Sequence, residues 1–324
     1  MSAVAVVSPL PGEGLARLAR LHEVRVHPDG ASLGGRELAA FVADAEALIS
    51  LLSSKVDREV FAACRRLKVV ANCAVGFDNV DLAAAQQAGV WVTNTPDVLT
   101  EATADLTWAL ILAVTRHVVE GDRVMRAGKF TGWRLDYMLG TGLQGKTLGI
   151  IGMGRIGRAV ARRALAFGMR VAYTDVAPMP EAGGEGLRFV ARLEELLAAS
   201  EVLSVHAPMT AQTRGLLDAP RLAMLPRGAI VVNAARGGIV DEDALADLLE
   251  AGHLGGAGLD VHESEPMPNP RLVARDDVVL LPHLGSATRE TRAAMADLTV
   301  ENVVAVLAGR TPPTPVVTPE HPRG

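Results

Sequence analysis

The chain has 324 residues, 49% of them hydrophobic and 21% charged, which at roughly 100–200 residues per domain indicates two domains and excludes a disordered chain. Its 32 Lys and Arg against 37 Asp and Glu give a net charge of −5, so the chain offers no strongly basic surface for nucleic acid or an anionic membrane. Its two cysteines, Cys64 and Cys73, cannot form a disulfide framework or a zinc site, and we expect small buried hydrophobic residues in a reducing compartment.

The N-terminus predicts a first strand at residues 4–7 rather than a signal peptide, because it lacks basic residues and runs directly into a Pro/Gly turn. No segment reaches the roughly 18 consecutive apolar residues of a membrane span. The longest candidate, residues 106–114, is interrupted by Thr107 and indicates a buried helix. We therefore expect a cytoplasmic protein.

Short apolar runs alternate with helical stretches along the chain, the pattern of a parallel α/β architecture. In the first part, strands are expected at 4–7, 48–51, 68–72 and 91–93, and helices at 12–21, 35–43, 57–66 and 81–88. Together, these first ~95 residues are typical of one doubly wound unit.

A long helix is predicted over residues 100–117, with Glu101 and Asp105 near its start, where the helix dipole favours acidic groups. Residues 121–145 follow, a polar and glycine-punctuated stretch with little periodicity. It is too long for a plain connection, and it contains Trp133 and Tyr137. Large aromatic side chains favour interfaces, so we expect a homodimer built on this helix and this arm.

A second unit begins after the arm. Its strands are expected at 147–151, 170–174, 202–205, 229–233, 256–259 and 278–281, and its helices at 158–167, 193–199, 220–224 and 242–251. The last helix, 288–308, is long enough to cross back to the first unit, and the proline-rich tail from Thr311 is expected to be extended.

A glycine-rich turn, GMGRIG at residues 152–157, lies between a predicted strand and a predicted helix. Gly152 permits a tight turn, Gly154 lets a pyrophosphate approach the backbone, and Gly157 lets the helix pack closely on the strand. Asp175 ends the next strand about 20 residues on, where a carboxylate can bind ribose hydroxyls. An ordinary glycine-rich turn of an α/β protein is the alternative, but this combination favours a dinucleotide site.

Three polar residues follow predicted parallel strands: Arg236, Glu265 and His283. Each lies at a carboxyl end, the edge at which open α/β sheets bind ligands. A single His after a strand is more often structural than catalytic. Arg, Glu and His together, however, make a complete set for acid–base chemistry and anion binding.

The chain resembles the D-isomer-specific 2-hydroxyacid dehydrogenases over nearly its full length. The matching segments are 74–81 (AVGFDNVD), 100–105 (TEATAD), 145–157, 206–210, 213–215, 233–242, 258–261 and 282–288. Within the family, the runs AVGFDNVDL and TEATADL look most like those of glyoxylate/hydroxypyruvate reductases. The resemblance implies two doubly wound parallel-sheet domains, a Rossmann-type cofactor domain (100–287) inserted into a flavodoxin-like substrate domain (1–99 plus 288–324).

The resemblance also implies residue roles. Arg236 would bind the substrate carboxylate, since its planar fork suits two oxygens. His283 would donate a proton to the keto oxygen during reduction, and Glu265 would bond the other ring nitrogen. No metal is needed. The implied substrate-binding residues are Leu52, Ser53, Val75, Gly76, Arg236 and Tyr137. The implied cofactor-binding residues are Thr103, Gly152, Gly154, Arg155, Ile156, Gly157, Asp175, His206, Pro208, Thr213, Ala234, Ala235, Asp260 and Gly285.

NAD is the expected cofactor, with NADH preferred over NADPH. Asp175 would meet a 2′-phosphate as a like charge, and Val176-Ala177-Pro178 after it brings no cation before Arg188. For Thr103 and Thr213, helix or loop capping is the alternative role. For Tyr137, which stands four residues after Trp133, an aromatic packed within its own subunit is the alternative to one that reaches the partner's active site.

Three alternative functions stay open. Phosphoglycerate dehydrogenases share these motifs, although their serine-pathway members often add a regulatory domain, and this chain ends soon after the helix at 288–308. Phosphite dehydrogenases place a Lys where this chain has Val75. NAD-sensing transcriptional corepressors keep the Arg236, Glu265 and His283 set and use the fold mainly to bind.

Overall fold

The computed structural model describes residues 1–28, 33–179 and 186–323. The chain forms two compact units, one of Met1–Leu99 and Ser286–Gly324, the other of Thr100–Gly285. The sequence alone places the second boundary two residues later, between 287 and 288. No helix in the described ranges is both long enough and apolar enough to cross a membrane.

The first unit contains a six-stranded sheet in the order β13-β5-β4-β3-β1-β2. Its strands are β1 (Ala3–Val6), β2 (Glu23–Val26), β3 (Ala47–Ser50), β4 (Val69–Asn72), β5 (Trp91–Thr93) and β13 (Pro315–Val317). All pair in parallel except β13, which runs antiparallel to β5. The order 2-1-3-4-5 of the parallel strands is that of flavodoxin-like folds, as expected.

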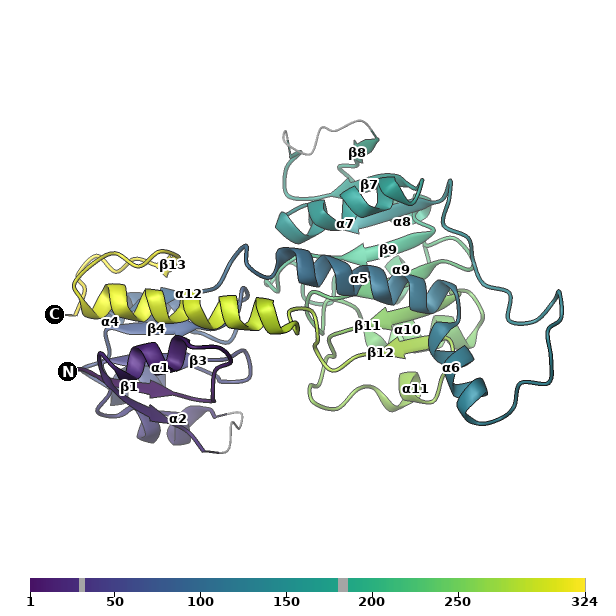
Figure 1. The fold of residues 1–324 in the computed structure, drawn as a ribbon. Helices are drawn as coiled ribbons and strands as arrows, with labels where there is room; N and C mark the ends of the chain where they lie inside the picture. The colour runs from purple at the N-terminus through teal and green to yellow at the C-terminus, as the bar shows by residue number, and fades with distance from the viewer. Residues whose placement is uncertain (29–32, 180–185, 324) are drawn as a thin grey trace. The chain divides into compact units, whose positions relative to one another are not determined.

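Helices cover both faces of this sheet (Figure 1). On one face, α12 (Arg289–Leu307) packs against α1 (Gly14–Ala19) and crosses β3, β4 and β5. On the other face lie α2 (Gly35–Val42), α3 (Arg58–Ala63) and α4 (Leu82–Ala88), whose buried side chains share one core with the strands. The last helix therefore returns to the first unit, as its length predicts. Cys64 and Cys73 are both buried and free.

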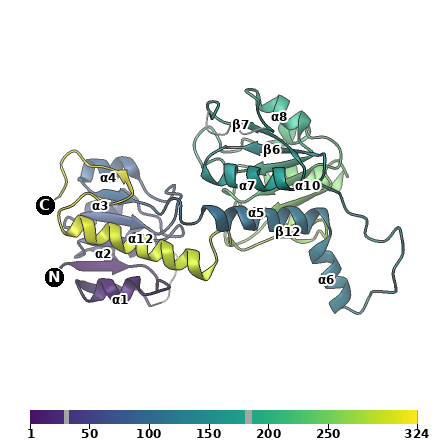
Figure 2. The ribbon, with the colours of Figure 1, turned by 45° about the horizontal axis from the view of Figure 1, so that its top comes forward.

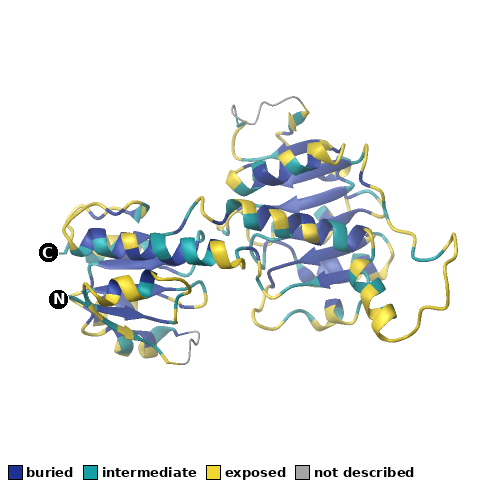
Figure 3. Ribbon diagram, in the orientation of Figure 1, coloured by how far each residue is buried: buried dark blue, intermediate teal, exposed yellow. Residues whose placement is uncertain are grey.

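The second unit contains a seven-stranded sheet, entirely parallel, in the order β12-β11-β10-β9-β6-β7-β8. Its strands are β6 (Thr147–Ile151), β7 (Arg170–Thr174), β8 (Leu187–Phe189), β9 (Val202–Val205), β10 (Ile230–Asn233), β11 (Gly256–Leu259) and β12 (Val278–Leu280). This is the 3-2-1-4-5-6 Rossmann order with one further strand. Because both faces are covered, the central strands are buried along their whole length (Figure 3).

Each face of this sheet has its own hydrophobic core. On one face lie α5 (Thr100–Thr115) and α7 (Arg155–Ala166), seen together in Figure 2. On the other lie α8 (Leu193–Ala199), α9 (Ala219–Leu222) and α10 (Glu242–Glu250). The short helices α6 (Val118–Arg126) and α11 (Pro270–Val273) complete the unit.

The arm differs from the prediction, because its first residues continue a helix. His117 takes a φ of 51°, which separates α5 from α6, and α6 runs through to Arg126. Within α6, Arg126 Nε donates to Asp122 Oδ2 at 2.7 Å, an i,i+4 pair that supports the helix. Gly121 and the charged residues around it interrupt the helical spacing of apolar residues, so the sequence does not predict this helix. The chain from 127 to 142 has no helix or strand and is largely exposed, and it extends away from the sheet (Figures 1 and 2).

Candidate active site

The glycine-rich turn lies where the strand order of the second sheet reverses, between β6 and β9. Gly152 follows β6 with a φ of 92°, and a Cβ there would lie 2.7 Å from the amide nitrogen of Ala207. It would also lie 2.8 Å from the carbonyl carbon of His206, so only glycine fits. In open parallel sheets, such a reversal point is the crevice that receives the ligand.

The other two glycines serve different needs. A Cβ on Gly157 would collide with the carbonyl oxygen of Gly152, so Gly157 lets α7 pack on the turn. A Cβ on Gly154 would meet nothing within 4 Å, which leaves open space beside the first residues of α7. That helix begins at Arg155, three residues earlier than the sequence predicts. Open space and helical amide donors together fit the pyrophosphate of a dinucleotide.

Asp175 lies beside this turn, directly after β7. Its Oδ2 accepts a hydrogen bond from the amide of Met153 at 2.7 Å, and its Oδ1 accepts one from Val176 at 2.7 Å. Each carboxylate oxygen has a second lone pair, so both oxygens keep capacity for ribose hydroxyls. The carboxylate is therefore fixed in place at the turn by the backbone.

Glu265 and His283 form a pair at the carboxyl ends of neighbouring strands. The ring Nδ1 of His283 lies 3.2 Å from Oε2 of Glu265, and Oε1 of Glu265 accepts the amide hydrogen of His262 at 3.2 Å. Burial raises the pKa of Glu265, but the hydrogen bond and the charge of His283 outweigh burial, so its pKa lies below the usual value. A bond at Nδ1 directs the other ring nitrogen away from Glu265, as a proton donor requires.

Asp260 holds the segment that carries His283. Its carbonyl oxygen accepts the amide hydrogen of His283 at 2.9 Å. Its carboxylate accepts those of Leu284 at 2.6 Å and Gly285 at 2.7 Å. His283 has a φ of 56°, a conformation that non-glycine residues adopt at a cost of about 1–3 kcal/mol unless their surroundings enforce it. Burial raises the pKa of Asp260.

Arg236 follows β10, the strand beside β11. Asn233 shapes its loop: Nδ2 donates to the carbonyl of Arg236 at 2.8 Å, and Oδ1 accepts from the amide of Ala235 at 3.0 Å. A Cβ on Gly237 would collide with the backbone of His262, so the loops after β10 and β11 are in contact. The three candidate catalytic residues thus lie on adjoining loops at one edge of the sheet.

Several candidate cofactor residues lie at the same edge. A Cβ on Gly285 would lie 3.2 Å from Oδ2 of Asp260 and 3.3 Å from Cγ2 of Thr103, which brings the start of α5 to the loop after β12. After β9, Thr213 Oγ1 donates to the carbonyl of Pro208 at 2.6 Å. The same hydroxyl accepts the amide hydrogen of Thr210 at 2.8 Å, so Thr213 has hydrogen-bond partners within its own loop.

His206, directly after β9, has a pKa far from that of an ordinary histidine. Burial lowers its pKa to about 4, so its ring is neutral near pH 7. Its Nε2 lies 2.8 Å from Oγ of Ser204. Arg155 and Ile156 begin α7, and Ala234 and Ala235 follow β10, so these candidates also lie at the carboxyl ends of strands.

The candidate substrate residues of the first unit lie on two loops that asparagines join. Asn79 Nδ2 donates to the carbonyls of Leu51 and Ser54, each at 2.9 Å, and so holds the loop of Leu52 and Ser53. Asn72 Nδ2 donates to the carbonyl of Gly76 at 2.8 Å. Val75 and Gly76 are half-buried, as is Leu52, whereas Ser53 is exposed. Neither asparagine is predicted as a site residue from the sequence, although Asn72 is a polar residue at the end of a buried strand, a position that often carries function.

Tyr137 lies on the arm of the second unit. Its ring centroid is 6.2 Å from that of Phe130, and the guanidinium of Arg134 lies 5.5 Å from its centroid. Trp133 and Leu135 nearby are 80% and 82% exposed. The arm therefore presents apolar side chains to solvent.

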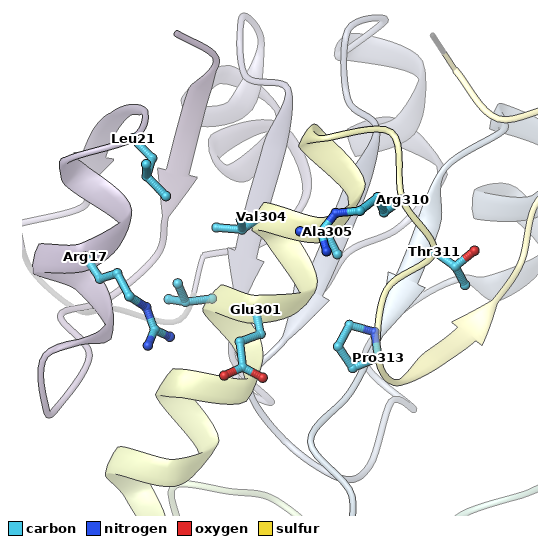
Figure 4. Close-up of a pocket in the computed structure, with 9 residues that line it drawn as sticks. Arg17, Leu21, Glu301, Val304, Ala305, Arg310, Thr311 and Pro313 are labelled. Carbon is cyan, nitrogen blue, oxygen red and sulfur yellow. The ribbon is translucent and has the colours of Figure 1, made fainter.

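A separate cavity of about 380 Å³ opens in the first unit between α1 and α12 (Figure 4). Arg17, Leu21, Glu301 and Arg310 are among the residues that line it, and none of the candidate site residues does. Within the described ranges, no group of three or more His, Cys, Asp or Glu side chains is placed to hold a metal ion.

Comparison with known proteins places the chain in a large set of relatives. Residues 108–285 match the family model of the D-isomer specific 2-hydroxyacid dehydrogenase NAD binding domain. The chain is 44% identical over 316 residues to a glyoxylate reductase of Thermococcus kodakarensis, covering 96% of this chain and 95% of that protein. It is 45% identical over 306 residues to a glyoxylate reductase of Aeropyrum pernix, covering 93% and 91%.

Solved structures of related proteins have the same fold as this chain. A Thermus thermophilus protein is 49% identical with a TM-score of 0.90, covering 97% of this chain and all of that one. The NADPH-dependent glyoxylate/hydroxypyruvate reductase of Sinorhizobium meliloti, solved with NADP and malonate, is 34% identical with a TM-score of 0.88. That match covers 100% of this chain and 99% of the other.

Proposed function

The chain belongs to the D-isomer-specific 2-hydroxyacid dehydrogenase family, an NAD(P)-dependent oxidoreductase, and we propose that it reduces glyoxylate to glycolate, which has no stereocentre, and hydroxypyruvate to the D-2-hydroxy acid. The pairing of Glu265 with His283 carries this proposal, since it supplies the oriented acid that reduction of a keto group needs. The names of the relatives support the choice of substrates.

In the proposed mechanism, His283 protonates the keto oxygen while C2 receives a hydride. When bound, the reduced nicotinamide supplies that hydride. Arg236 binds the substrate carboxylate and offsets the negative charge that develops on the oxygen. Glu265 fixes the ring orientation of His283 and stabilises the imidazolium before transfer. Holding both reactants in one geometry supplies much of the rate.

The remaining site residues fall into two proposed groups. Leu52, Ser53, Val75 and Gly76, with Tyr137 from the arm, are assigned to the substrate. The residues assigned to the cofactor are Thr103, Gly152, Gly154, Arg155, Ile156, Gly157, Asp175, His206, Pro208, Thr213, Ala234, Ala235, Asp260 and Gly285. In this assignment, residues 100–287 bind the cofactor, and residues 1–99 with 288–324 bind the substrate.

NADH is the proposed cofactor over NADPH. The support is the carboxylate of Asp175, fixed at the glycine-rich turn by the amides of Met153 and Val176. A 2′-phosphate there would meet like charge, whereas two ribose hydroxyls would find acceptors. The Sinorhizobium meliloti relative is NADPH-dependent, so the preference needs its own measurement.

A homodimer is the proposed assembly, formed through α5 and the arm. The exposed Phe130, Trp133, Leu135 and Leu139 support it, because a soluble chain rarely presents so many large apolar side chains on one segment without a partner. A cytoplasmic location is supported by the two free, buried cysteines.

The experiment is a turnover assay of the purified protein with glyoxylate, hydroxypyruvate or 3-phosphohydroxypyruvate and either NADH or NADPH. Oxidation of the cofactor with the two unphosphorylated acids supports the proposal. Preference for the phosphorylated acid would identify a phosphoglycerate dehydrogenase instead. Cofactor binding without turnover of any acid would point to a sensor.

A further inference from the structure

His262 lies at the centre of the three loops that carry the proposed catalytic residues. It follows β11 and is 8% exposed. Its amide donates to Oε1 of Glu265 at 3.2 Å, and its ring Nε2 lies 3.0 Å from the carbonyl oxygen of Leu281. Leu281 stands two residues before His283. One residue therefore contacts Glu265 through its backbone and the His283 segment through its side chain.

The ring bond has a defined direction. A carbonyl oxygen only accepts hydrogen bonds, so Nε2 of His262 carries the hydrogen and donates a hydrogen bond to the carbonyl of Leu281. The ring Nδ1 is buried and has no hydrogen-bond partner within the parts of the chain that the structure describes. The side chain thus makes one directed bond, and that bond joins the loop after β11 to the end of β12.

The third loop meets the backbone of the same residue. The Cα of Gly237, next to Arg236, lies so close to His262 that a Cβ would overlap its carbonyl group. On the other side, Oε1 of Glu242 in α10 accepts the amide hydrogen of Glu263 at 2.7 Å. The loop therefore stays attached to α10 whatever the ring of His262 does, and a change of that ring should shift the loop without unfolding it.

We propose that His262 is a positioning residue for reduction: its ring bond to Leu281 keeps Glu265 within hydrogen-bond distance of His283. The inference rests on the roles proposed above for Glu265 and His283. Its physical basis is that the two partners come from different loops, so their separation depends on whatever holds those loops together. Asp260 and Glu265 act electrostatically on His283, and Glu242 and Glu265 act on His262; the three carboxylates are retained in the His262 variants below.

The test replaces His262 by Phe, which keeps a ring and removes the donor, and by Gln, which keeps a donor at similar reach. We expect His262→Phe to lower kcat for glyoxylate about 10-fold, because small misplacements of reacting groups are costly to rate. The pH at which activity falls by half on the alkaline side should move down, since a more distant Glu265 stabilises the protonated His283 less. KM for glyoxylate should change little, and His262→Gln should restore both kcat and the pH midpoint.

His253→Phe is a matched control at the opposite end of β11. Its Nε2 also lies near a backbone carbonyl, that of Leu225 at 2.9 Å. His253 and Leu225 precede β11 and β10, so they lie at the amino ends of strands whose carboxyl ends carry the candidate catalytic loops. It should leave kcat and the pH midpoint unchanged. Circular dichroism and NADH binding establish that each variant is folded. His262→Leu, which also lacks the donor, replaces His262→Phe if the latter fails this check.

Three results would overturn the proposal: unchanged kcat in the donor-less variant, a lower kcat with an unmoved pH midpoint, or an equal loss in His262→Gln. Glu265→Gln is measured in parallel. If Glu265→Gln itself leaves kcat and the pH midpoint unchanged, the proposed function of the pair fails, and that outcome is distinct from a failure confined to His262.

Discussion

Nδ1 of His283 lies 3.2 Å from Oε2 of Glu265, and the two residues come from loops that follow β12 and β11. The pairing lowers the pKa of Glu265 below its usual value of about 4.3, even though burial acts in the opposite direction. An ordinary imidazole gains and loses its proton around pH 6.5. The carboxylate of Glu265 therefore remains ionised throughout that range.

Glu265→Gln should move the alkaline limb of the pH profile for glyoxylate reduction to lower pH. Reduction needs protonated His283, so activity falls as the pH rises through the value at which that proton is lost. Removing the ionised carboxylate destabilises the imidazolium, so the proton is lost earlier. The measurement is kcat/KM for glyoxylate across the range from about pH 5 to about pH 9. A profile identical to that of the parent would contradict the role given to Glu265.

His283→Ala should depress kcat by roughly 10²–10⁴-fold, the usual contribution of a positioned acid, with NADH binding retained. Arg236→Ala should instead raise KM for the keto acid and lower kcat as well, because the guanidinium both binds the carboxylate and offsets developing charge. Arg192→Ala, on an exposed residue paired with Glu195, serves as the control and should behave as the parent. A His283 variant with unchanged kcat would remove the proposed mechanism.

Asn79→Ala should raise KM for glyoxylate and destabilise the first unit, with KM for NADH little changed. The side chain donates to the carbonyls of Leu51 and Ser54. After its removal the carbonyl of Leu51 keeps the amide of Ser54 as a donor, whereas that of Ser54, a buried residue, loses this hydrogen bond. An unsatisfied buried group costs about 1–3 kcal/mol, which urea unfolding can resolve. Asn269→Ala removes the N-cap of α11 and an exposed bond to Asp243 in the second unit, and it is the control for KM. Equal effects of both variants on KM for glyoxylate would contradict the assignment.

Trp133→Ser combined with Leu135→Ser should weaken the proposed dimer. Both side chains are largely exposed on the arm, and interface aromatics commonly contribute most of the binding energy. Sedimentation velocity at micromolar concentration should show a dimer for the parent and monomer for the double variant. Val273→Ser, an exposed apolar residue on α11, should leave the dimer intact. A monomeric parent would show that the arm has another role.

The sequence predicts the central strands well, because strands such as β6 and β9 are covered on both faces and appear as continuous apolar runs. The strands that the sequence does not predict, β2, β8 and β13, all lie at sheet edges. The residues of β2, Glu23-Val24-Arg25-Val26, remain partly exposed and carry charges, so they lack that pattern. Helices α6 and α11 are also missed, the first because Gly121 and its charged neighbours obscure the helical period.

The residues of the candidate site also divide into those that the sequence predicts and those that only the fold shows. Arg236, Glu265 and His283 are predictable because parallel strands bring their carboxyl ends to one edge. The roles of His262 and Asn79 are not predictable from the sequence. Each side chain donates a hydrogen bond to the backbone carbonyl of a residue distant in sequence, Leu281 for His262 and Leu51 for Asn79. A backbone carbonyl has no sequence signature, and only the fold shows which side chain reaches it.

Asp175 gives the sharpest prediction for the cofactor. Asp175→Asn should raise kcat/KM with NADPH relative to NADH by about 10-fold or more, because it removes a charge that would repel a 2′-phosphate. It keeps an oxygen that can accept from the amide of Met153, so the glycine-rich turn stays in place. Asp175→Ser tests the same change with a shorter side chain. Asp276→Ser, which removes an exposed ion pair with Arg123, should leave the ratio unchanged. A parent that already favours NADPH would show that Asp175 does not face the ribose, and the preference would then have to come from residues beyond β7.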